Sequence, residues 1–101
     1  GIPKEIEDLV KKRDLKCVYC YTVFTAKQKG TWEHIDNERW DDISIMLENI
    51  ALCCNRCNSS KGAKRIQDWF NTKYCKERNI KAETVSTDIM PFICKIIKNN
   101  F

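Results

Sequence analysis

The chain of 101 residues contains a single histidine, His34, so any reaction that needs an imidazole must use this one side chain. It also lacks an apolar run of about 18 residues or more, which argues against a membrane-spanning helix. The first residues have no apolar core of the kind found in signal peptides. No linker, low-complexity segment or internal repeat is present beyond two similar cysteine pairs. We therefore expect one small domain in a reducing, cytoplasmic setting, without a membrane partner.

Cysteine, by contrast, is abundant, and four of the seven residues form two Cys-x-x-Cys turns at 17–20 and 54–57. Each turn lets two thiolates reach one tetrahedral ion, and two turns complete a closed four-sulfur site. The spacing predicts a structural Zn²⁺ held by Cys17, Cys20, Cys54 and Cys57. Four buried free cysteines or two disulfides are the alternatives. The spacing selects Cys54 over Cys53, which is interpreted as a small buried residue, and Cys75 and Cys94 are expected in the core.

Apolar periodicity predicts helices over about residues 3–13, 64–78 and 87–99, and Thr87 is expected to cap the last of them. Another helix is expected to begin at Cys54 and to stop at Gly62. Residues 31–36 and 49–53 have β-like compositions, and the segment between them is rich in charge. We expect one α+β domain over residues 1–101, with a strand–loop–strand–helix core within 17–62. The net charge of +4 is compatible with nucleic acid as a partner.

Within this core, three motifs follow one another: Glu33-His34, Asn49-Ile50 and Cys57-Asn58-Ser59-Ser60-Lys61. Their ordered combination resembles the zinc-bound subgroup of the HNH nuclease family, over residues 17–62. The acid is Glu where the family usually has Asp, the last motif has the Asn of the HNN variant, and no proline follows the histidine. The resemblance implies a ββα-metal unit, in which two strands and a helix surround one divalent cation.

Phosphodiester hydrolysis needs an activated water, a cation on the phosphoryl oxygens and help for the leaving oxygen. We interpret His34 as the general base, and Glu33 and Asn58 as ligands of a catalytic Mg²⁺ or Mn²⁺. The resemblance implies that Asn49 belongs to the catalytic site by fixing the loop that aims His34. Adjacent residues of a regular strand face opposite sides, so Glu33 and His34 can share a site only if the strand ends, twists or bulges there. We expect such an irregularity.

The expected function is that of a DNA endonuclease leaving 5′-phosphate and 3′-hydroxyl ends, as the resemblance implies, in a restriction, phage or homing system. One site cuts one strand, so cleavage of both strands would need a homodimer or two encounters. Cations near Asn58 are candidate phosphate contacts, with a solvated surface as the alternative: Arg56, Lys61, Lys64 and Arg65.

Other interpretations of these residues remain open. Asn58 is also suited to capping the helix after Cys57, and Asp36 is expected to be a turn residue rather than a substitute ligand. Four aromatic residues are interpreted as packing rather than base-stacking groups: Trp32, Trp40, Trp69 and Phe70. The main rival function is a non-catalytic zinc module that binds nucleic acid or protein. A redox protein using its Cys-x-x-Cys thiols is a weaker rival.

Overall fold

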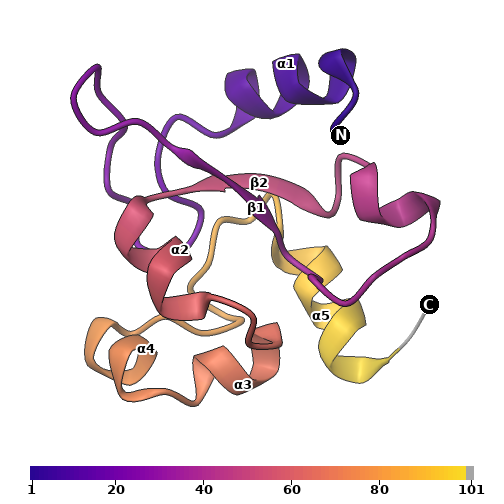
Figure 1. Cartoon of the computed structure of the whole chain (residues 1–101). Helices are drawn as coiled ribbons and strands as arrows, with labels where there is room; N and C mark the ends of the chain where they lie inside the picture. Colours follow the sequence, from indigo (N-terminus) through magenta and orange to yellow (C-terminus); the bar gives the residue numbers. More distant parts are fainter. Residues whose placement is uncertain (100–101) are drawn as a thin grey trace.

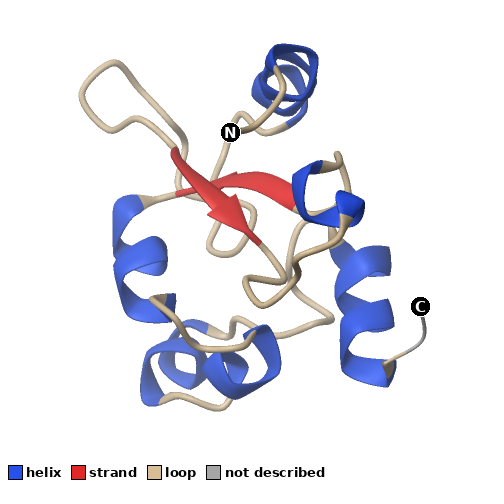
Figure 2. Ribbon diagram, turned by 45° about the vertical axis from the view of Figure 1, so that its right-hand side comes forward, coloured by secondary structure: helices blue, strands red, loops and turns tan. Residues whose placement is uncertain are grey.

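The computed structural model describes residues 1–99 and contains a two-stranded antiparallel sheet with helices on both sides (Figure 1). Helix α1 (Lys4–Arg13) lies above the sheet in Figures 1 and 2, and the helices that follow the sheet lie below it. The elements after α1 are, in order, β1 (Thr31–His34), the 3-10 helix η1 (Asp42–Ile45), β2 (Ile50–Cys53), α2 (Asn55–Lys61), α3 (Ile66–Phe70), α4 (Lys73–Arg78) and α5 (Met90–Lys98). The predicted α+β class is confirmed.

The domain predicted over 1–101 includes residues 100 and 101, which lie outside the described residues. Within residues 1–99, no helix combines the length and the apolar character needed to cross a bilayer.

The two strands pair regularly, with Glu33 opposite Ala51 and His34 opposite Ile50. Side chains therefore alternate between the two faces of the sheet, and Glu33 is buried whereas His34 is exposed. Strand β1 ends at His34, two residues earlier than expected, yet its pairing up to that residue contains no bulge. The irregularity expected at this point does not bring Glu33 and His34 to the same face.

The sheet separates two hydrophobic clusters. On the α1 side, Val10 packs with Ile50 and Leu52 in a small cluster. On the opposite side, a larger cluster includes Tyr19 and Trp69, whose rings meet edge to face with centroids 4.8 Å apart. The larger cluster also contains buried residues of the two cysteine turns, so a metal bound there would be part of the main core.

The second cysteine turn, 54–57, forms the cap and the first residues of helix α2. The Cys54 Sγ accepts a hydrogen bond from the Cys57 backbone N–H at 3.5 Å, so a cysteine caps this helix. Asn58 is therefore not the cap. The helix stops at Gly62, as predicted, because its φ of 51° is a conformation that glycine adopts at little cost.

The remaining predicted helices are shorter than expected. The helix predicted over 64–78 is divided into α3 and α4 because Thr72 interrupts it. The Thr72 hydroxyl donates to the Trp69 carbonyl at 2.6 Å and accepts from the Cys75 N–H at 3.4 Å, which caps α4. Helix α5 begins three residues later than expected, so Thr87 is not its cap, and Pro91 lies in its first turn, where no N–H is needed.

An ion pair between Arg13 and Asp14, at the end of α1, binds backbone groups along the outer edge of β2. The Asp14 Oδ2 accepts a hydrogen bond from the Leu52 N–H at 3.0 Å, and Arg13 binds the same carboxylate through two N–H groups at 2.8 and 2.9 Å. Arg13 also donates to the Ile50 carbonyl at 2.8 Å. Only 4% of Asp14 is exposed. The contact therefore joins α1 to the sheet through buried, charge-assisted hydrogen bonds.

We predict that Asp14→Ala lowers the free energy of unfolding by about 3–5 kcal/mol, because it leaves Arg13 and the Leu52 N–H without their partner. Urea denaturation at a fixed zinc concentration measures the change. Asp8→Ala is the matched control, since it removes an aspartate whose ion pair with Lys4 is exposed to solvent, and it should change little. Equal effects of the two substitutions would contradict this account of the sheet edge.

Candidate metal centre and candidate active site

The two cysteine turns bring four sulfur atoms together at the start of α2. All four Sγ atoms lie within 4.8 Å of one another, and the Sγ atoms of Cys20 and Cys54 are 3.6 Å apart. A tetrahedral zinc site with Zn–S bonds of about 2.3 Å requires sulfur separations of about 3.8 Å, so small adjustments would complete it. This is the only group of three or more potential metal ligands of the Cys, His, Asp and Glu types within residues 1–99. Four cysteines that could hold a metal ion such as zinc therefore converge here: Cys17, Cys20, Cys54 and Cys57.

Hydrogen bonds around the cluster favour thiolate formation at one ligand. The thiol of Cys57 hydrogen-bonds to Cys17, which lowers the pKa of Cys17 to about 5 and raises the pKa of Cys57. The Cys20 N–H donates to the Cys17 Sγ at 3.5 Å, and Tyr74 Oη lies 3.2 Å from the Cys57 Sγ. Metals bind thiolates, so an ion that binds here would displace protons from those cysteines that are still protonated.

The neighbouring cysteine is not part of this group. Cys53 is buried, its Sγ lies 3.7 Å from the Thr31 hydroxyl, and burial raises its pKa. The choice of Cys54 over Cys53 as the clustered residue is confirmed.

The remaining cysteines differ in burial. Cys75 is buried as expected, whereas Cys94 is only partly buried. All seven cysteines are free thiols, so the disulfide alternative is not observed.

His34 lies at the exposed end of β1, on the α1 side of the sheet. It lines a shallow cavity of about 340 Å³ together with Asn37, Arg39, Trp40 and Ser44, all from the segment between the two strands. The structure thus places the only imidazole of the chain where a ligand from solvent can reach it.

Asn49 holds the segment that follows His34. Its side-chain oxygen accepts a hydrogen bond from the Asp36 N–H at 2.7 Å, and its amide group donates to the carbonyls of Asp36 and Ser44 at 3.3 and 3.0 Å. Asn49 is fully buried. The geometry agrees with the expectation that Asn49 fixes the loop beside His34 and does not itself face a ligand.

Glu33, on the opposite face from His34, belongs to a buried hydrogen-bonded group. Its Oε2 accepts from the Tyr19 hydroxyl at 2.7 Å and lies 3.2 Å from Lys61 Nζ, which also donates to the His34 carbonyl at 3.3 Å. Lys61 is 1% exposed. Its prediction as a DNA contact is therefore wrong, because a buried ammonium paired with a carboxylate cannot meet a phosphate. Tyr19 was missed, and only its position inside the first cysteine turn pointed to it.

Asn58 lies on α2, and the structure records no side-chain hydrogen bond for it within residues 1–99. Its backbone participates in the helix, with its N–H donating to the Cys54 carbonyl at 3.0 Å. Its side chain is half-buried. Within residues 1–99, no hydrogen bond joins Glu33 to Asn58, and the positive charge beside Glu33 comes from Lys61.

The other predicted phosphate contacts are exposed: Arg56, Lys64 and Arg65. The Lys64 carbonyl accepts a hydrogen bond from the Asn37 amide at 3.2 Å, which ties the junction of α2 and α3 to the loop beside His34. The charged ends of Lys64 and Arg65 already have partners: Lys64 Nζ donates to the Ser60 carbonyl at 3.2 Å, and Arg65 Nε lies 3.2 Å from Asp68 Oδ2.

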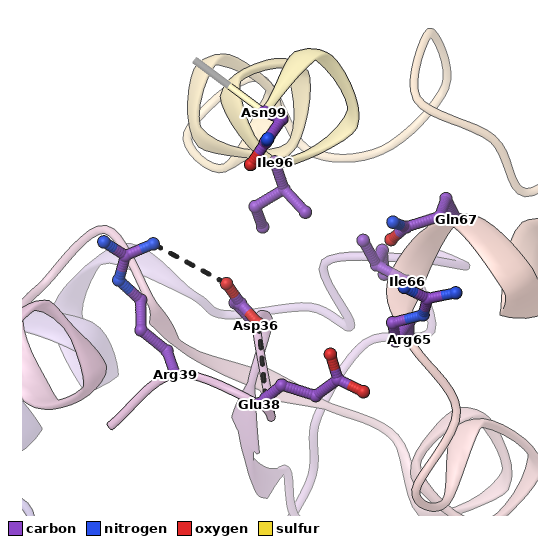
Figure 3. Close-up of a pocket in the computed structure, with 8 residues that line it drawn as sticks. All are labelled: Asp36, Glu38, Arg39, Arg65, Ile66, Gln67, Ile96 and Asn99. Atoms are coloured by element: carbon purple, nitrogen blue, oxygen red, sulfur yellow. Dashed lines mark hydrogen bonds and ion pairs between the residues drawn. The ribbon is translucent and has the colours of Figure 1, made fainter. Parts of the chain in front are cut away.

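A second cavity, of about 200 Å³, lies between this loop, α3 and α5 (Figure 3). The carboxylates of Asp36 and Glu38 and the guanidinium groups of Arg39 and Arg65 line it. Asp36 accepts a hydrogen bond from the Glu38 N–H at 3.2 Å, and its other oxygen is 3.7 Å from Arg39. Asp36 is therefore a turn residue, as expected, and Arg39 balances its charge.

A larger cavity, of about 570 Å³, lies on the α1 side of the sheet and is mainly apolar. Phe24, Trp32 and Leu52 line it, and Lys11 and Lys29 add positive charge. It contains no histidine or cysteine, so the acid–base and thiol chemistry of the chain lies elsewhere.

No family model, curated protein or solved structure matches this chain.

We predict one zinc ion per chain and its loss in Cys54→Ser, together with a marked fall in melting temperature. Zinc-coupled folding in small peptides is worth about 10–16 kcal/mol at neutral pH, so removing one ligand should affect the whole domain. Metal analysis after gel filtration measures the stoichiometry. Cys53→Ser is the adjacent control and should retain one zinc. Loss of zinc in the control alone, or in neither variant, would contradict the assignment.

We predict that Lys61→Met lowers the free energy of unfolding by about 3–5 kcal/mol, because Glu33 then remains buried without its counter-charge. Adding Glu33→Gln should restore most of that loss, since the amide is neutral and still accepts from Tyr19. Chemical denaturation of the single and double variants measures the coupling. Lys64→Met, at an exposed lysine, provides the control and should be nearly neutral. Additive effects of Lys61→Met and Glu33→Gln would contradict the ion pair.

Proposed function

We propose that the chain is a metal-dependent DNA endonuclease of the HNH type, with its hairpin and helix stapled by zinc. The observation that carries the proposal is the position of His34, whose side chain is exposed at the end of β1 and lines an open cavity. Strands β1 and β2 and helix α2 follow one another in the order of a ββα unit. The motif resemblance and this arrangement support the same function.

In this proposal, His34 is the general base. An imidazole accepts a proton readily near neutral pH, and the open cavity admits both water and a phosphodiester. The water attacks phosphorus as its proton passes to His34, a new P–O bond forms, and the bond to the 3′ oxygen breaks. The departing oxygen takes up a proton, so the products are a 5′-phosphate and a 3′-hydroxyl.

The catalytic cation would be Mg²⁺ or Mn²⁺, with Glu33 and Asn58 as its protein ligands. The oxygens of Glu33 and of the His34 carbonyl already face one positive charge, the Lys61 ammonium at 3.2 and 3.3 Å, so this position suits a cation. A metal held by Glu33 and acting together with His34 would require Lys61 to move away and the end of β1 to turn, because Glu33 is buried on the opposite face of the sheet from the His34 side chain. When bound, a divalent ion polarises the phosphoryl group and stabilises charge on the leaving oxygen.

DNA would be held mainly through its phosphates. Arg56, Lys64 and Arg65 are exposed, and the chain carries a net charge of +4. Such contacts provide affinity without reading sequence. One site would cut one strand, so cleavage of both strands would require a homodimer or two encounters. A restriction, phage or homing system would be compatible with this activity.

The rival function, a non-catalytic zinc module that binds nucleic acid or protein, is favoured by one observation. Lys61 neutralises Glu33 inside the protein, and such a pair can serve as a purely structural contact. The two functions differ in whether DNA is cut in the presence of Mg²⁺ or Mn²⁺.

We predict that His34→Ala reduces plasmid nicking by about 10²–10⁴-fold, because the water loses its general base. Zinc content, melting temperature and DNA affinity should remain close to those of the wild type. Nicking with Mg²⁺ or Mn²⁺, followed on agarose gels, measures the rate. Leu15→Ala changes an exposed residue outside this cavity and should retain activity. Full activity of His34→Ala would exclude this mechanism, and an inactive wild-type protein that binds DNA would support the rival function.

A further inference from the structure

Trp40 is the most exposed large apolar side chain of the described residues, with 96% of its surface accessible. The interpretation of Trp40 as a packing residue is therefore wrong. Trp69 is fully buried, and Trp32 packs against the α1-side cluster, so the other two tryptophans have structural roles. An indole could bury about 150–250 Å² in a contact. Leaving such a group in water beside a candidate active site requires an explanation.

The backbone around Trp40 is held in place on both sides. Arg39 and Asp41 flank it and form two parallel hydrogen bonds, each 2.8 Å long. Asp41 also caps η1 by accepting from the Ile43 N–H at 3.2 Å. Asn49 anchors the residues before and after this segment through the hydrogen bonds of its amide. The loop therefore presents the indole outward from a fixed base, and binding there would require little ordering of the backbone.

Hydrogen-bonding groups and charges of both signs surround Trp40, since Arg39 precedes it and the exposed Asp41 and Asp42 follow it. The indole shares a cavity with His34, Asn37 and Ser44, whose side chains carry hydrogen-bonding groups. The Asn37 amide binds the Lys64 carbonyl, so the exposed Lys64 and its neighbour in sequence, an exposed arginine, lie close to the same loop. An aromatic plane next to hydrogen-bonding groups suits a ligand with a flat ring and polar edges.

We propose that Trp40 and the cavity beside His34 form a binding site for an unpaired nucleobase. In a duplex, neighbouring bases cover both faces of each base, so only an unstacked base can stack on the indole. The proposal rests on the proposed function and deepens it: the substrate class becomes single-stranded DNA or DNA with unpaired bases. Stacking on Trp40 places the adjoining phosphodiester near His34, and Lys64 and Arg65 bind the flanking phosphates.

The test measures binding, not cleavage, in the wild-type protein without added divalent metal. Fluorescence anisotropy gives the affinity for a labelled single-stranded oligonucleotide, for the matching duplex and for the duplex with a central mismatch. Trp40→Ala should weaken single-strand binding by roughly 5- to 150-fold, the range typical of removing one aromatic ring on which a base stacks. Binding to the perfect duplex should change much less. Trp40→Phe retains an aromatic face and should recover most of the affinity.

Two further variants separate stacking from charge and from general apolar contact. Lys64→Ala with Arg65→Ala should reduce the salt dependence of single-strand binding, by roughly 0.7 in the slope of log affinity for each phosphate that is no longer neutralised. Oligonucleotide binding should still quench tryptophan fluorescence in that variant, and the quenching should disappear in Trp40→Phe. Leu15→Ala removes an exposed apolar side chain outside this cavity and should leave binding unchanged.

An equal weakening of single-strand and duplex binding, or quenching that persists in Trp40→Phe, would overturn the inference. A wild-type protein that dissociates from dimers to monomers when Trp40 is replaced, with unchanged DNA affinity, would also overturn it and assign the indole to an interface between copies. Normal cleavage with no effect of Trp40→Ala on binding would remove this inference alone. Single-strand binding that depends on Trp40, in a protein that does not cut DNA, would support the base site and remove the nuclease proposal.

Discussion

The convergence of four sulfur atoms between the first cysteine turn and the start of α2 is the constraint on which the rest of the molecule depends. These turns are far apart in the sequence, and the segment between them contains the whole hairpin. A metal ion held there would join the chain before β1 to the helix after β2. A domain of this size buries a modest core, and the cluster lies inside the larger of its two hydrophobic clusters.

Because side chains alternate between the two faces of the sheet along β1, the adjacent residues Glu33 and His34 lie on opposite faces. Glu33 points into the larger cluster, where Tyr19 and Lys61 satisfy its charge and hydrogen-bonding capacity. His34 points out into an open cavity, while its carbonyl oxygen still meets Lys61. The same buried lysine, Lys61, thus contacts both residues of the motif. It holds the backbone of His34 through the carbonyl oxygen and leaves the imidazole free to face the cavity.

The loop between the strands shows how a polar core residue can organise an exposed site. Asn49 is fully buried and uses both ends of its amide on backbone groups of the loop. Arg39 and Asp41 hold the loop through their ion pair. The one large aromatic side chain of the loop, Trp40, lies in solvent. Rigid support from below and an exposed aromatic ring above are properties of a binding surface more than of a flexible connection.

Local sequence signals determined those features that depend on short-range spacing. The Cys-x-x-Cys turns identified the sulfur cluster, helical periodicity located α1, and Gly62 marked the end of α2, whereas the role of Asn49 was expected only from the family resemblance. Features that depend on which groups meet across the fold were decided by tertiary structure alone. Lys61 and Lys64 look alike in the sequence, but their places on α2 and after it put one beside a buried carboxylate and the other in solvent. Trp40 and Trp69 likewise differ only in what surrounds them, because burial is a property of the packed fold and not of the residue type.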